Sequence, residues 1–498
     1  MNILEQINRH SLQMPERIAI QCNELTLTYR ELEEQSNILA AAIAKRIPGR
    51  VPVAVYGHKH PMMLVCFLAL VKSGHGYCPI DTSVPDERVN MILDALDCNI
   101  CLALEPLTAP DKQVLTFSDI EQMLTADCDP ASALTPVQAD EIFYMIFTSG
   151  STGVPKGVMI TRSNLEHYLD WSVTLGSSME DKSGSTFLNQ APFSFDLSVM
   201  DTYTSLACGG TLWALTKEVQ TDYRKLYASL LQSNIKVWVS TPSFAEICMS
   251  DPVFCAENLC SLHLFLFCGE TLSPQTAAKL RRRFPDAVIM NTYGPTESTV
   301  AVTGVLIDDS MIHANAPLPV GRAKPGTYIE IHNKAGEILP DGEKGEIHIL
   351  GDTVSAGYYH NPEGSAKAFY ETTRDGSLVR GYHSGDEGYL IDGLLYYSGR
   401  IDLQIKLHGY RIELEDIENN ILRLPDVTQA VVVPNMRRGA VRSLTAYLVA
   451  ASDIETIRSA LSDLLPHYMI PKKIVLMDRL PMTNNGKIDR KQLGGTAS

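Results

Sequence analysis

Short apolar runs alternate with helical segments along most of this chain. Between Val51 and Leu104, three apolar runs of strand length are separated by two segments with helical periodicity. A second series of such runs lies between Thr186 and Asn291. Strands that alternate with helices pair in parallel, because each helix carries the chain back across one face of a sheet. The pattern therefore predicts an α/β fold with mostly parallel sheets wrapped by helices.

The chain has 498 residues, which is too long for one ordinary hydrophobic core. From Gly326 to Gly351 the apolar period becomes two, and Asp392-Gly393 between apolar residues predicts a hairpin, so we expect a small β subdomain there. After residue 400, a helix, two strands and a second helix predict a small α+β unit. We expect a large domain over residues 1–400 and a mobile domain over residues 401–498.

The charge balance argues against a nucleic-acid partner. The chain carries 58 acidic and 42 basic side chains, a formal net charge of −16, whereas nucleic-acid binders need a basic surface. This argues against an aminoacyl-tRNA synthetase. No apolar run is long enough for membrane insertion, and no secretory signal is recognisable. The 11 cysteines lack zinc-site spacing, so we expect free thiols in the cytoplasm.

One apolar run breaks into a loop rich in glycine and hydroxyl residues, Thr148-Ser-Gly-Ser-Thr-Gly-Val-Pro-Lys-Gly157, and then resumes. Glycines allow backbone N–H groups to surround a phosphate, and Ser151, Thr152 and Lys156 add further donors. The loop is not a Walker A motif, because Pro155 replaces its second glycine and no Ser or Thr follows the lysine. It predicts a nucleotide phosphate site of another kind.

Polar residues also follow other predicted strands. In Asn291-Thr-Tyr-Gly-Pro-Thr-Glu297, the ring of Tyr293 can stack on adenine and the carboxylate of Glu297 can hold Mg²⁺, although a plain strand-end turn is the alternative. The carboxylate of Asp386 can accept hydrogen bonds from ribose hydroxyl groups, although a simple turn without a binding role is the alternative interpretation. Asp196 lies among apolar residues and needs a cation, either a substrate ammonium or an internal partner. Lys487, on a Gly-containing loop, would by itself indicate only a surface lysine.

Taken together, these segments resemble the adenylate-forming ligases. The resemblance covers essentially the whole chain, and the joint occurrence of the motifs in this order is highly specific. Ser384 is one departure, since many relatives have threonine there. The segments that carry the resemblance to the adenylate-forming ligases are Thr28-Tyr-Arg-Glu-Leu32, Lys72-Ser-Gly74, Tyr77-Cys-Pro-Ile-Asp81, the loop after Phe147, Asn291 to Glu297, Ser384-Gly-Asp386, Gly399-Arg-Ile-Asp402, Gly409-Tyr-Arg-Ile-Glu413 and Asn485-Gly-Lys-Ile-Asp489.

The resemblance implies two half-reactions that use ATP and Mg²⁺. Within the family, the segments 193–199, 240–246, 266–270 and 293–302 are most similar to ligases that attach D-alanine to a phosphopantetheinylated carrier protein for D-alanylation of (lipo)teichoic acid. The implied nucleotide-binding residues are Ser151, Thr152, Asn291, Thr292, Tyr293, Gly294, Pro295, Thr296, Asp386, Tyr397, Ser398, Gly399, Arg400 and Lys487.

The resemblance also implies roles in the substrate pocket and at the domain boundary. Asp196, Cys268 and Val300 would surround D-alanine, although a packed core thiol is the alternative for Cys268. Lys487 would contact both substrates and be catalytic, and Asp402 would be the hinge.

Other activities fit less well. An adenylation enzyme for another small amino acid, of the nonribosomal-peptide type, shares these motifs and stays open. An acyl-CoA ligase shares the nucleotide motifs but offers no ammonium to Asp196. A merely nucleotide-binding partner of a carrier protein is disfavoured because Lys487, Asp386 and Glu297 are all present. An oxidoreductase is disfavoured because no Gly-x-Gly-x-x-Gly follows a predicted strand.

Overall fold

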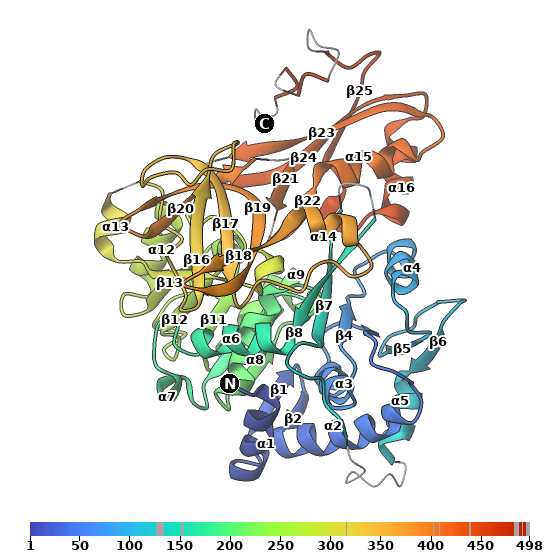
Figure 1. The fold of residues 1–498 in the computed structure, drawn as a ribbon, viewed down its shortest axis with the longest axis vertical. Helices are drawn as coiled ribbons and strands as arrows, with labels where there is room; N and C mark the ends of the chain where they lie inside the picture. Colours follow the sequence, from blue (N-terminus) through green and yellow to red (C-terminus); the bar gives the residue numbers. More distant parts are fainter. Residues whose placement is uncertain are drawn as a thin grey trace.

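The structure is a computed structural model that describes residues 1–125, 134–150, 154–314, 316–401, 403–407, 409–437, 440–482, 488–490 and 492–494. A large N-terminal domain carries a small C-terminal domain at one end (Figure 1). The predicted α/β class is confirmed: the large domain contains two sheets that are mostly parallel, and a third, antiparallel sheet.

The first sheet has nine strands. Its central pairs β1–β10, β10–β9, β9–β11, β11–β12 and β12–β13 are parallel, and the strands at its edges are antiparallel. Its order is β15 (Arg322–Ala323), β14 (Thr303–Leu306), β13 (Val288–Tyr293), β12 (Leu264–Phe267), β11 (Ile235–Ser240), β9 (Thr186–Asn189), β10 (Thr211–Ala214), β1 (Ile18–Cys22) and β2 (Leu25–Thr28).

The second sheet has six strands, and only β7 and β8 pair in antiparallel fashion. Its order is β6 (Gln113–Thr116), β5 (Ile100–Ala103), β3 (Val53–Tyr56), β4 (Tyr77–Ile80), β7 (Ile142–Thr148) and β8 (Lys156–Thr161). The sequence pattern predicted the strands up to residue 104 but missed β6 and the helix α5 (Phe117–Thr125) that follows it.

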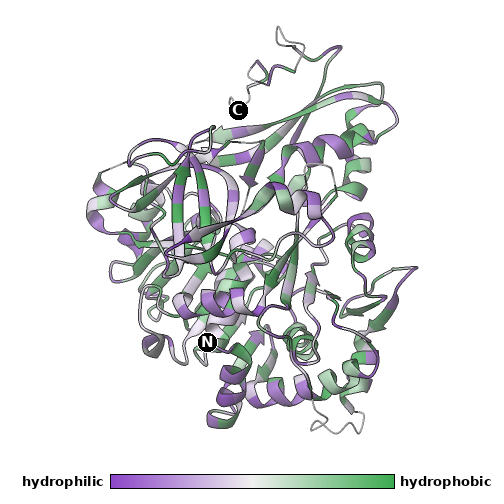
Figure 2. Cartoon of the chain, in the orientation of Figure 1, coloured by the Kyte–Doolittle hydropathy of each residue, from purple (hydrophilic) through white to green (hydrophobic). Residues whose placement is uncertain are grey.

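Two helices are buried almost completely, and the sequence of α3 is accordingly apolar on nearly every face, whereas α8 also buries polar residues such as Asp201. All residues of α3 (Pro61–Lys72) except Met62 are buried, and α3 contacts strands of both sheets. All residues of α8 (Leu197–Ala207) are buried as well. Figure 2 shows polar residues along the helices at the lower edge of the domain, α1 (Ile3–Gln13) and α2 (Tyr29–Ala44). The other helices of this domain are α4 (Asp86–Ala95), α6 (Arg162–Ser172), α7 (Met179–Lys182), α9 (Lys217–Thr221), α10 (Tyr223–Gln232), α11 (Pro242–Cys248), α12 (Pro274–Arg283), α13 (Asp309–His313) and α14 (Pro362–Ala368).

The predicted β subdomain is a five-stranded antiparallel sheet. Its order is β16 (Thr327–His332), β17 (Gly345–Gly351), β19 (Ser377–Ile391) and β18 (Phe369–Arg374), with β20 (Leu394–Arg400) also paired to β19. The predicted hairpin at Asp392-Gly393 is confirmed. Both residues have positive φ, 50° and 75°, the conformation that favours Asp-Gly in a tight β-turn.

The small domain has its own hydrophobic core, which contains residues from Ile405 to Ile474. Leu461 of one helix and Ala446 of one strand are among its fully buried residues. Its elements are the hairpin β21 (Gln404–Leu407) and β22 (Tyr410–Glu413), the helices α15 (Leu414–Leu422) and α16 (Ile454–Leu464), and a sheet of β23 (Val427–Arg437), β24 (Ala440–Ala450) and β25 (Lys473–Leu476). The sequence pattern predicted these helices and this sheet but did not predict the β21–β22 hairpin.

Candidate active site

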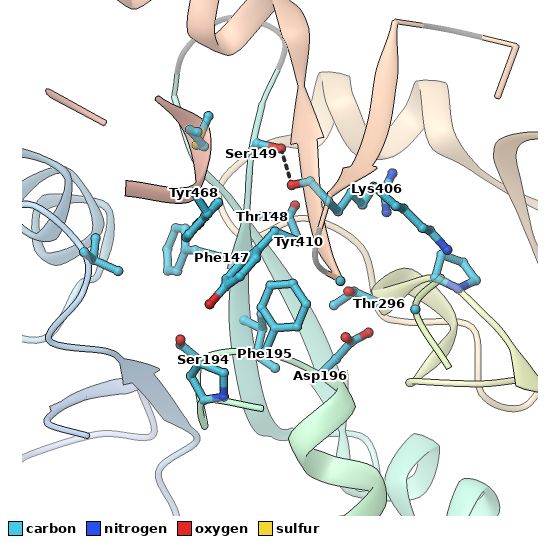
Figure 3. A pocket seen from close by; sticks show the side chains of 18 of the residues that line it. Phe147, Thr148, Ser149, Ser194, Phe195, Asp196, Thr296, Lys406, Tyr410 and Tyr468 are labelled. Carbon is cyan, nitrogen blue, oxygen red and sulfur yellow. Dashed lines mark hydrogen bonds between the residues drawn. The ribbon is translucent and has the colours of Figure 1, made fainter. Parts of the chain in front are cut away.

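A cavity of about 100 Å³ lies where the small domain meets the large one. The carboxyl ends of β4 and β7, the start of α8 and the segment after β13 line it on the large-domain side. The β21–β22 hairpin and the residues after α16 line it on the other side (Figure 3). Ligands of open parallel sheets bind at the carboxyl ends of strands, so this cavity is the natural candidate for the active site.

The predicted phosphate loop joins β7 to β8 at the cavity wall. Thr148 and Lys156 are opposite each other in the hairpin, and Thr148 and Ser149 line the cavity. A Cβ on Gly150 would lie 2.2 Å from the carbonyl oxygen of Val154, so only glycine fits this turn. Ser151 and Thr152 lie outside the described residues, and their contact with phosphate stays a prediction.

The segment after β13 forms the opposite wall. Gly294, Pro295 and Thr296 line the cavity. A Cβ on Gly294 would lie 2.5 Å from the Cα of Ala301, which shows how tightly the turn folds back. Val300 has a φ of 68°, an unusual conformation for a β-branched residue and one that tends to occur at functional sites.

Tyr293 and Asp386 are linked by a short hydrogen bond. The Tyr293 hydroxyl donates to Asp386 Oδ2 at 2.5 Å, and Arg400 donates to Asp386 Oδ1 at 2.9 Å. Burial and the nearby Asp386 carboxylate raise the pKa of Tyr293 well above 10, so the phenol stays protonated. Asp386 and Arg400 line the cavity, whereas the Tyr293 ring lies behind it, 6.0 Å from the Tyr397 ring between centroids.

The other predicted nucleotide residues do not line the open cavity. Asn291 donates to the carbonyl of Pro319 at 2.8 Å, and the Thr292 hydroxyl donates to the carbonyl of Phe267 at 2.8 Å. Both side chains therefore form hydrogen bonds within the large domain. Ser398 is exposed, and Gly399 is partly exposed on the same strand, β20. Contact of these residues with a nucleotide stays a prediction.

Asp196 caps no backbone group, although it is the residue before α8. Its carboxylate lies in the cavity wall and accepts a hydrogen bond from the Thr296 side chain. Burial raises the pKa of Asp196 to about 6. The hydrogen bond from Thr296 opposes this shift, and the nearby Glu297 carboxylate reinforces it. Among the residues that the structure describes, no basic side chain forms an ion pair with it, so the site is electrostatically suited to an ammonium group.

Cys268 and Val300 are brought together, as the resemblance implied. The Cys268 thiol is buried and lies 3.7 Å from the carbonyl oxygen of Val300. Neither residue lines the open cavity, although Gly269 does. Burial raises the pKa of the Cys268 thiol, although a hydrogen bond with Thr292 acts in the opposite direction. The raised pKa argues against a reactive thiolate. Their contact with a substrate stays a prediction.

Glu297, the predicted Mg²⁺ ligand, is 1% exposed and already has a cationic partner. Arg411 of the small domain forms an ion pair with one oxygen, and Tyr358 donates to the other at 2.9 Å. Burial alone would raise the pKa of Glu297, but Arg411 and the hydrogen bonds outweigh it and lower the pKa below 4.5. Glu297 is thus a permanent anion whose cation, in this arrangement, is a guanidinium group.

The β21–β22 hairpin is the part of the site that sequence reasoning missed. The Tyr410 ring packs between Phe195, at 4.7 Å, and Tyr468, at 3.6 Å between centroids (Figure 3). The Lys406 ammonium lies 5.6 Å from the centre of the Tyr293 ring. The available signal was the motif 409–413, which was recognised as a family match but given no role, because its place depends on how the two domains meet.

The hairpin is fixed to the large domain through its backbone. The Ser149 hydroxyl donates to the Arg411 carbonyl at 3.0 Å, and the Gly409 N–H donates to Glu270 at 2.7 Å. Nearby, Arg88 of α4 pairs with the buried Asp416 at 3.1 Å. The hairpin is therefore bound to the phosphate loop itself rather than resting loosely over the opening.

Lys487 and Asp402 both lie outside the described residues. Met482 and Ile488, which flank the lysine loop, pair with each other, and neither lines the cavity. The roles of Lys487 as catalytic residue and of Asp402 as hinge stay predictions. Among the described helices, none is both long and apolar enough to cross a membrane.

Comparison with known proteins gives one consistent result. Residues 7–359 match the model of the AMP-binding enzyme family, and residues 416–487 match that of the AMP-binding enzyme C-terminal domain. The chain is 44% identical over 505 residues to proteins of Bacillus thuringiensis (strain Al Hakam) and of Bacillus cereus (strain B4264), each named D-alanine–D-alanyl carrier protein ligase, and the match covers 99% of each chain.

Solved structures agree. The fold matches PA1221, described as an NRPS protein containing adenylation and PCP domains and solved with a vinylsulfonamide inhibitor, with a TM-score of 0.84 and 25% identity, covering 99% of this chain and 84% of that one. It also matches a Vibrio cholerae adenylation domain solved with glycyl-adenosine-5′-phosphate, with a TM-score of 0.80 and 24% identity, over 99% and 96% of the two chains. This chain belongs to the AMP-binding enzyme family and is an adenylate-forming ligase.

Proposed function

We propose that this enzyme activates D-alanine with ATP and transfers the D-alanyl group to the phosphopantetheine thiol of a carrier protein, for D-alanylation of (lipo)teichoic acid. The relatives that are 44% identical over the whole chain support the substrate and the partner. The observation that carries the proposal is Asp196, a cavity carboxylate that forms no ion pair with a described basic side chain. A substrate ammonium group is the cation that it lacks.

In the first half-reaction, a carboxylate oxygen of D-alanine attacks the α-phosphorus of ATP, and pyrophosphate leaves. Asp196 anchors the ammonium group, and Cys268 with Val300 limits the side chain to a methyl group. The phosphate loop, with Ser151 and Thr152, holds the phosphates, while Asp386 holds the ribose. No protein nucleophile is needed, so catalysis rests on positioning and charge stabilisation.

We assign the Mg²⁺ site to Glu297. The carboxylate is buried and ionised, and its neighbour Thr296 lines the cavity, which suits a hard cation that prefers oxygen ligands. Bound Mg²⁺ would neutralise charge on the phosphates. Because Arg411 now forms an ion pair with this carboxylate, Glu297 is available to the ion only when the β21–β22 hairpin has withdrawn.

In the second half-reaction, the carrier thiolate attacks the carbonyl carbon of D-alanyl-AMP, and AMP leaves. We assign the arrangement described here, with Tyr410 and Arg411 at the cavity, to this transfer step. Adenylation then needs a second orientation, in which the domain 401–498 rotates about Asp402 and brings Lys487 to the phosphates. The domain limits 1–400 and 401–498 are part of this proposal.

We place the enzyme in the cytoplasm. ATP is available there, and the described cysteines carry free thiols, as in reducing compartments.

ATP–pyrophosphate exchange over a panel of amino acids that includes both alanine enantiomers tests the proposal. We expect D-alanine to give the highest kcat/KM and L-alanine a lower one. A preference for glycine, serine or another small amino acid would move the enzyme to the alternative, an adenylation enzyme of the nonribosomal-peptide type. Exchange with fatty or aryl acids alone would remove the role of Asp196.

A further inference from the structure

Three histidines and two glutamates gather on one face of the β subdomain, and none of them lines the cavity. His348 of β17 is directly opposite His383 of β19 and directly opposite Glu330 of β16. Glu346 lies two residues before His348, so both side chains project from the same face of the strand. His332 is opposite Glu346 on the other side. Strand register, not sequence spacing, assembles this group.

From this arrangement we propose that Glu346, His348 and His383 bind a divalent transition-metal ion, Zn²⁺ in the first place. His348 Nε2 lies 3.2 Å from His383 Nδ1 and 3.7 Å from Glu346 Oε2. One donor atom from each residue lies within 4.8 Å of the other two. Two imidazoles and one carboxylate, with a further position open to water, are a common ligand set for Zn²⁺.

The surroundings of His348 orient its ring as a metal ligand. His348 Nδ1 lies 3.0 Å from the Tyr370 hydroxyl, which occupies that nitrogen and leaves Nε2 facing the other two ligands. The Tyr370 ring can reach this position because it crosses Gly381, where a Cβ would lie 2.4 Å from the ring. Outer partners of this kind fix the orientation of the imidazole before an ion binds.

His332 forms one wall of the site without being a ligand. Its ring stacks on His348 with centroids 3.8 Å apart and planes 6° apart. Both of its nitrogens are occupied, Nε2 by Glu330 at 2.9 Å and Nδ1 by the carbonyl of Gly336 at 3.1 Å. His332 therefore supplies a matched control, because its ring is equally close to His348 but offers no free nitrogen.

The site is accessible and electrostatically suited to a cation. His348 is buried, whereas Glu346 and His383 are partly exposed, so an ion can enter from solvent. The Glu346 carboxylate brings a negative charge to the three ligands, and the Glu330 carboxylate lies 2.9 Å from Nε2 of the adjacent His332 ring. The other oxygen of Glu346 accepts the Gly385 N–H at 3.0 Å. A bound ion would thus also stiffen the segment that precedes Asp386.

Metal binding by the full-length enzyme, purified free of metal and without ATP, tests the proposal. Zn²⁺ would be titrated in competition with a chromophoric chelator, and Co²⁺ binding followed by visible absorption. We expect one ion per chain, with Co²⁺ d–d bands that lack the sulfur charge-transfer band of cysteine ligands. His348→Ala, His383→Ala and Glu346→Gln should each weaken binding by about tenfold or more.

His332→Phe keeps the stacked ring without its nitrogens and should bind Zn²⁺ as the parent enzyme does. Circular dichroism identifies any variant that fails to fold. If a histidine variant fails to fold, Glu346→Gln, which keeps the size and shape of the side chain, tests the site in its place. No stoichiometric Zn²⁺ binding, or binding that survives in Glu346→Gln and His383→Ala alike, would overturn the proposal. A thiolate charge-transfer band would assign the ion to cysteines and overturn it as well.

Discussion

At the scale of single residues, the proposed function assigns the substrate ammonium group to Asp196. Asp196→Asn keeps the size of the side chain but removes the charge that faces the substrate ammonium. Loss of one partner of a buried charge pair costs roughly 3–5 kcal/mol, so amino-acid-dependent pyrophosphate exchange should fall by about 150-fold or more. ATP binding, measured by calorimetry, should change little. The exposed Asp94→Asn is the control. Near-normal exchange in Asp196→Asn would show that the carboxylate is no ammonium anchor.

The same carboxyl predicts a pH dependence. Its pKa in the folded enzyme is about 6, above the ordinary 3.8, so Asp196 is mostly protonated below pH 6 and charged above it. The charged form binds the ammonium group, so kcat/KM for the amino acid should rise with pH through about 6 and level off above 7. Below pH 6 it should fall about tenfold for each pH unit. Steady-state exchange between pH 5 and 8 measures this. A flat profile in an enzyme that remains folded would contradict the role of Asp196.

Cys268 predicts how the enzyme selects by size. Cys268→Leu should exclude even alanine, whereas Cys268→Gly should admit other small amino acids or the opposite enantiomer. One methylene of fit is worth about 1–3 kcal/mol, so selectivity should weaken rather than vanish. The exposed Cys260→Ser controls for loss of a thiol. Relative kcat/KM values for both alanine enantiomers give the answer. Unchanged ratios in Cys268→Gly would remove the residue from the pocket.

At the scale of elements, the proposed function assigns the observed position of the β21–β22 hairpin to the transfer half-reaction. Arg411 reaches Glu297 only while the hairpin lies in the cavity. Arg411→Ala should therefore slow transfer from supplied D-alanyl-AMP to the carrier by about tenfold or more, since it leaves a buried carboxylate without its partner. Adenylation, measured by exchange, should stay within a few-fold.

Arg423→Ala is the matched control for this variant. It also removes an arginine–glutamate pair between the domains, with Glu87, but both side chains are exposed, and such pairs contribute little. Both half-reactions should be nearly unchanged in Arg423→Ala. If Arg411→Ala slows adenylation as much as transfer, the hairpin does not belong to one half-reaction.

At the scale of the whole molecule, the proposed mechanism assigns the two half-reactions to two domain orientations. Lys487→Ala should lose adenylation by roughly 100-fold or more, the scale of one preorganised charge contact in a transition state. Transfer from separately supplied D-alanyl-AMP should survive nearly intact. Asp402→Pro should restrict the hinge and slow the half-reaction that needs the disfavoured orientation. Equal loss of both half-reactions in Lys487→Ala would mean that no rotation takes place.

The order of elements in the large domain could be predicted from the sequence. The alternating strands and helices between Val51 and Leu104, and the second series between Thr186 and Asn291, are present in the structure, because periodicity acts over a few neighbouring residues. The phosphate loop was found for the same reason: its glycines and hydroxyl residues are contiguous. The family could also be recognised from such contiguous motifs. The short strand β6 and the hairpin β21–β22 carry too few residues for a clear period.

Only the tertiary structure decided which distant residues meet. The ion pair between Glu297 and Arg411 joins residues 114 positions apart, and it depends on the orientation of one domain on the other. Likewise, His348 and His383 meet through strand register, which follows from the pairing of β17 with β19 and leaves no fixed spacing in the sequence. The sequence by itself determined the local elements, the nucleotide motifs and the family. Non-local packing determined the Arg411 contact and the histidine cluster, because such contacts depend on how complete sheets and domains are arranged.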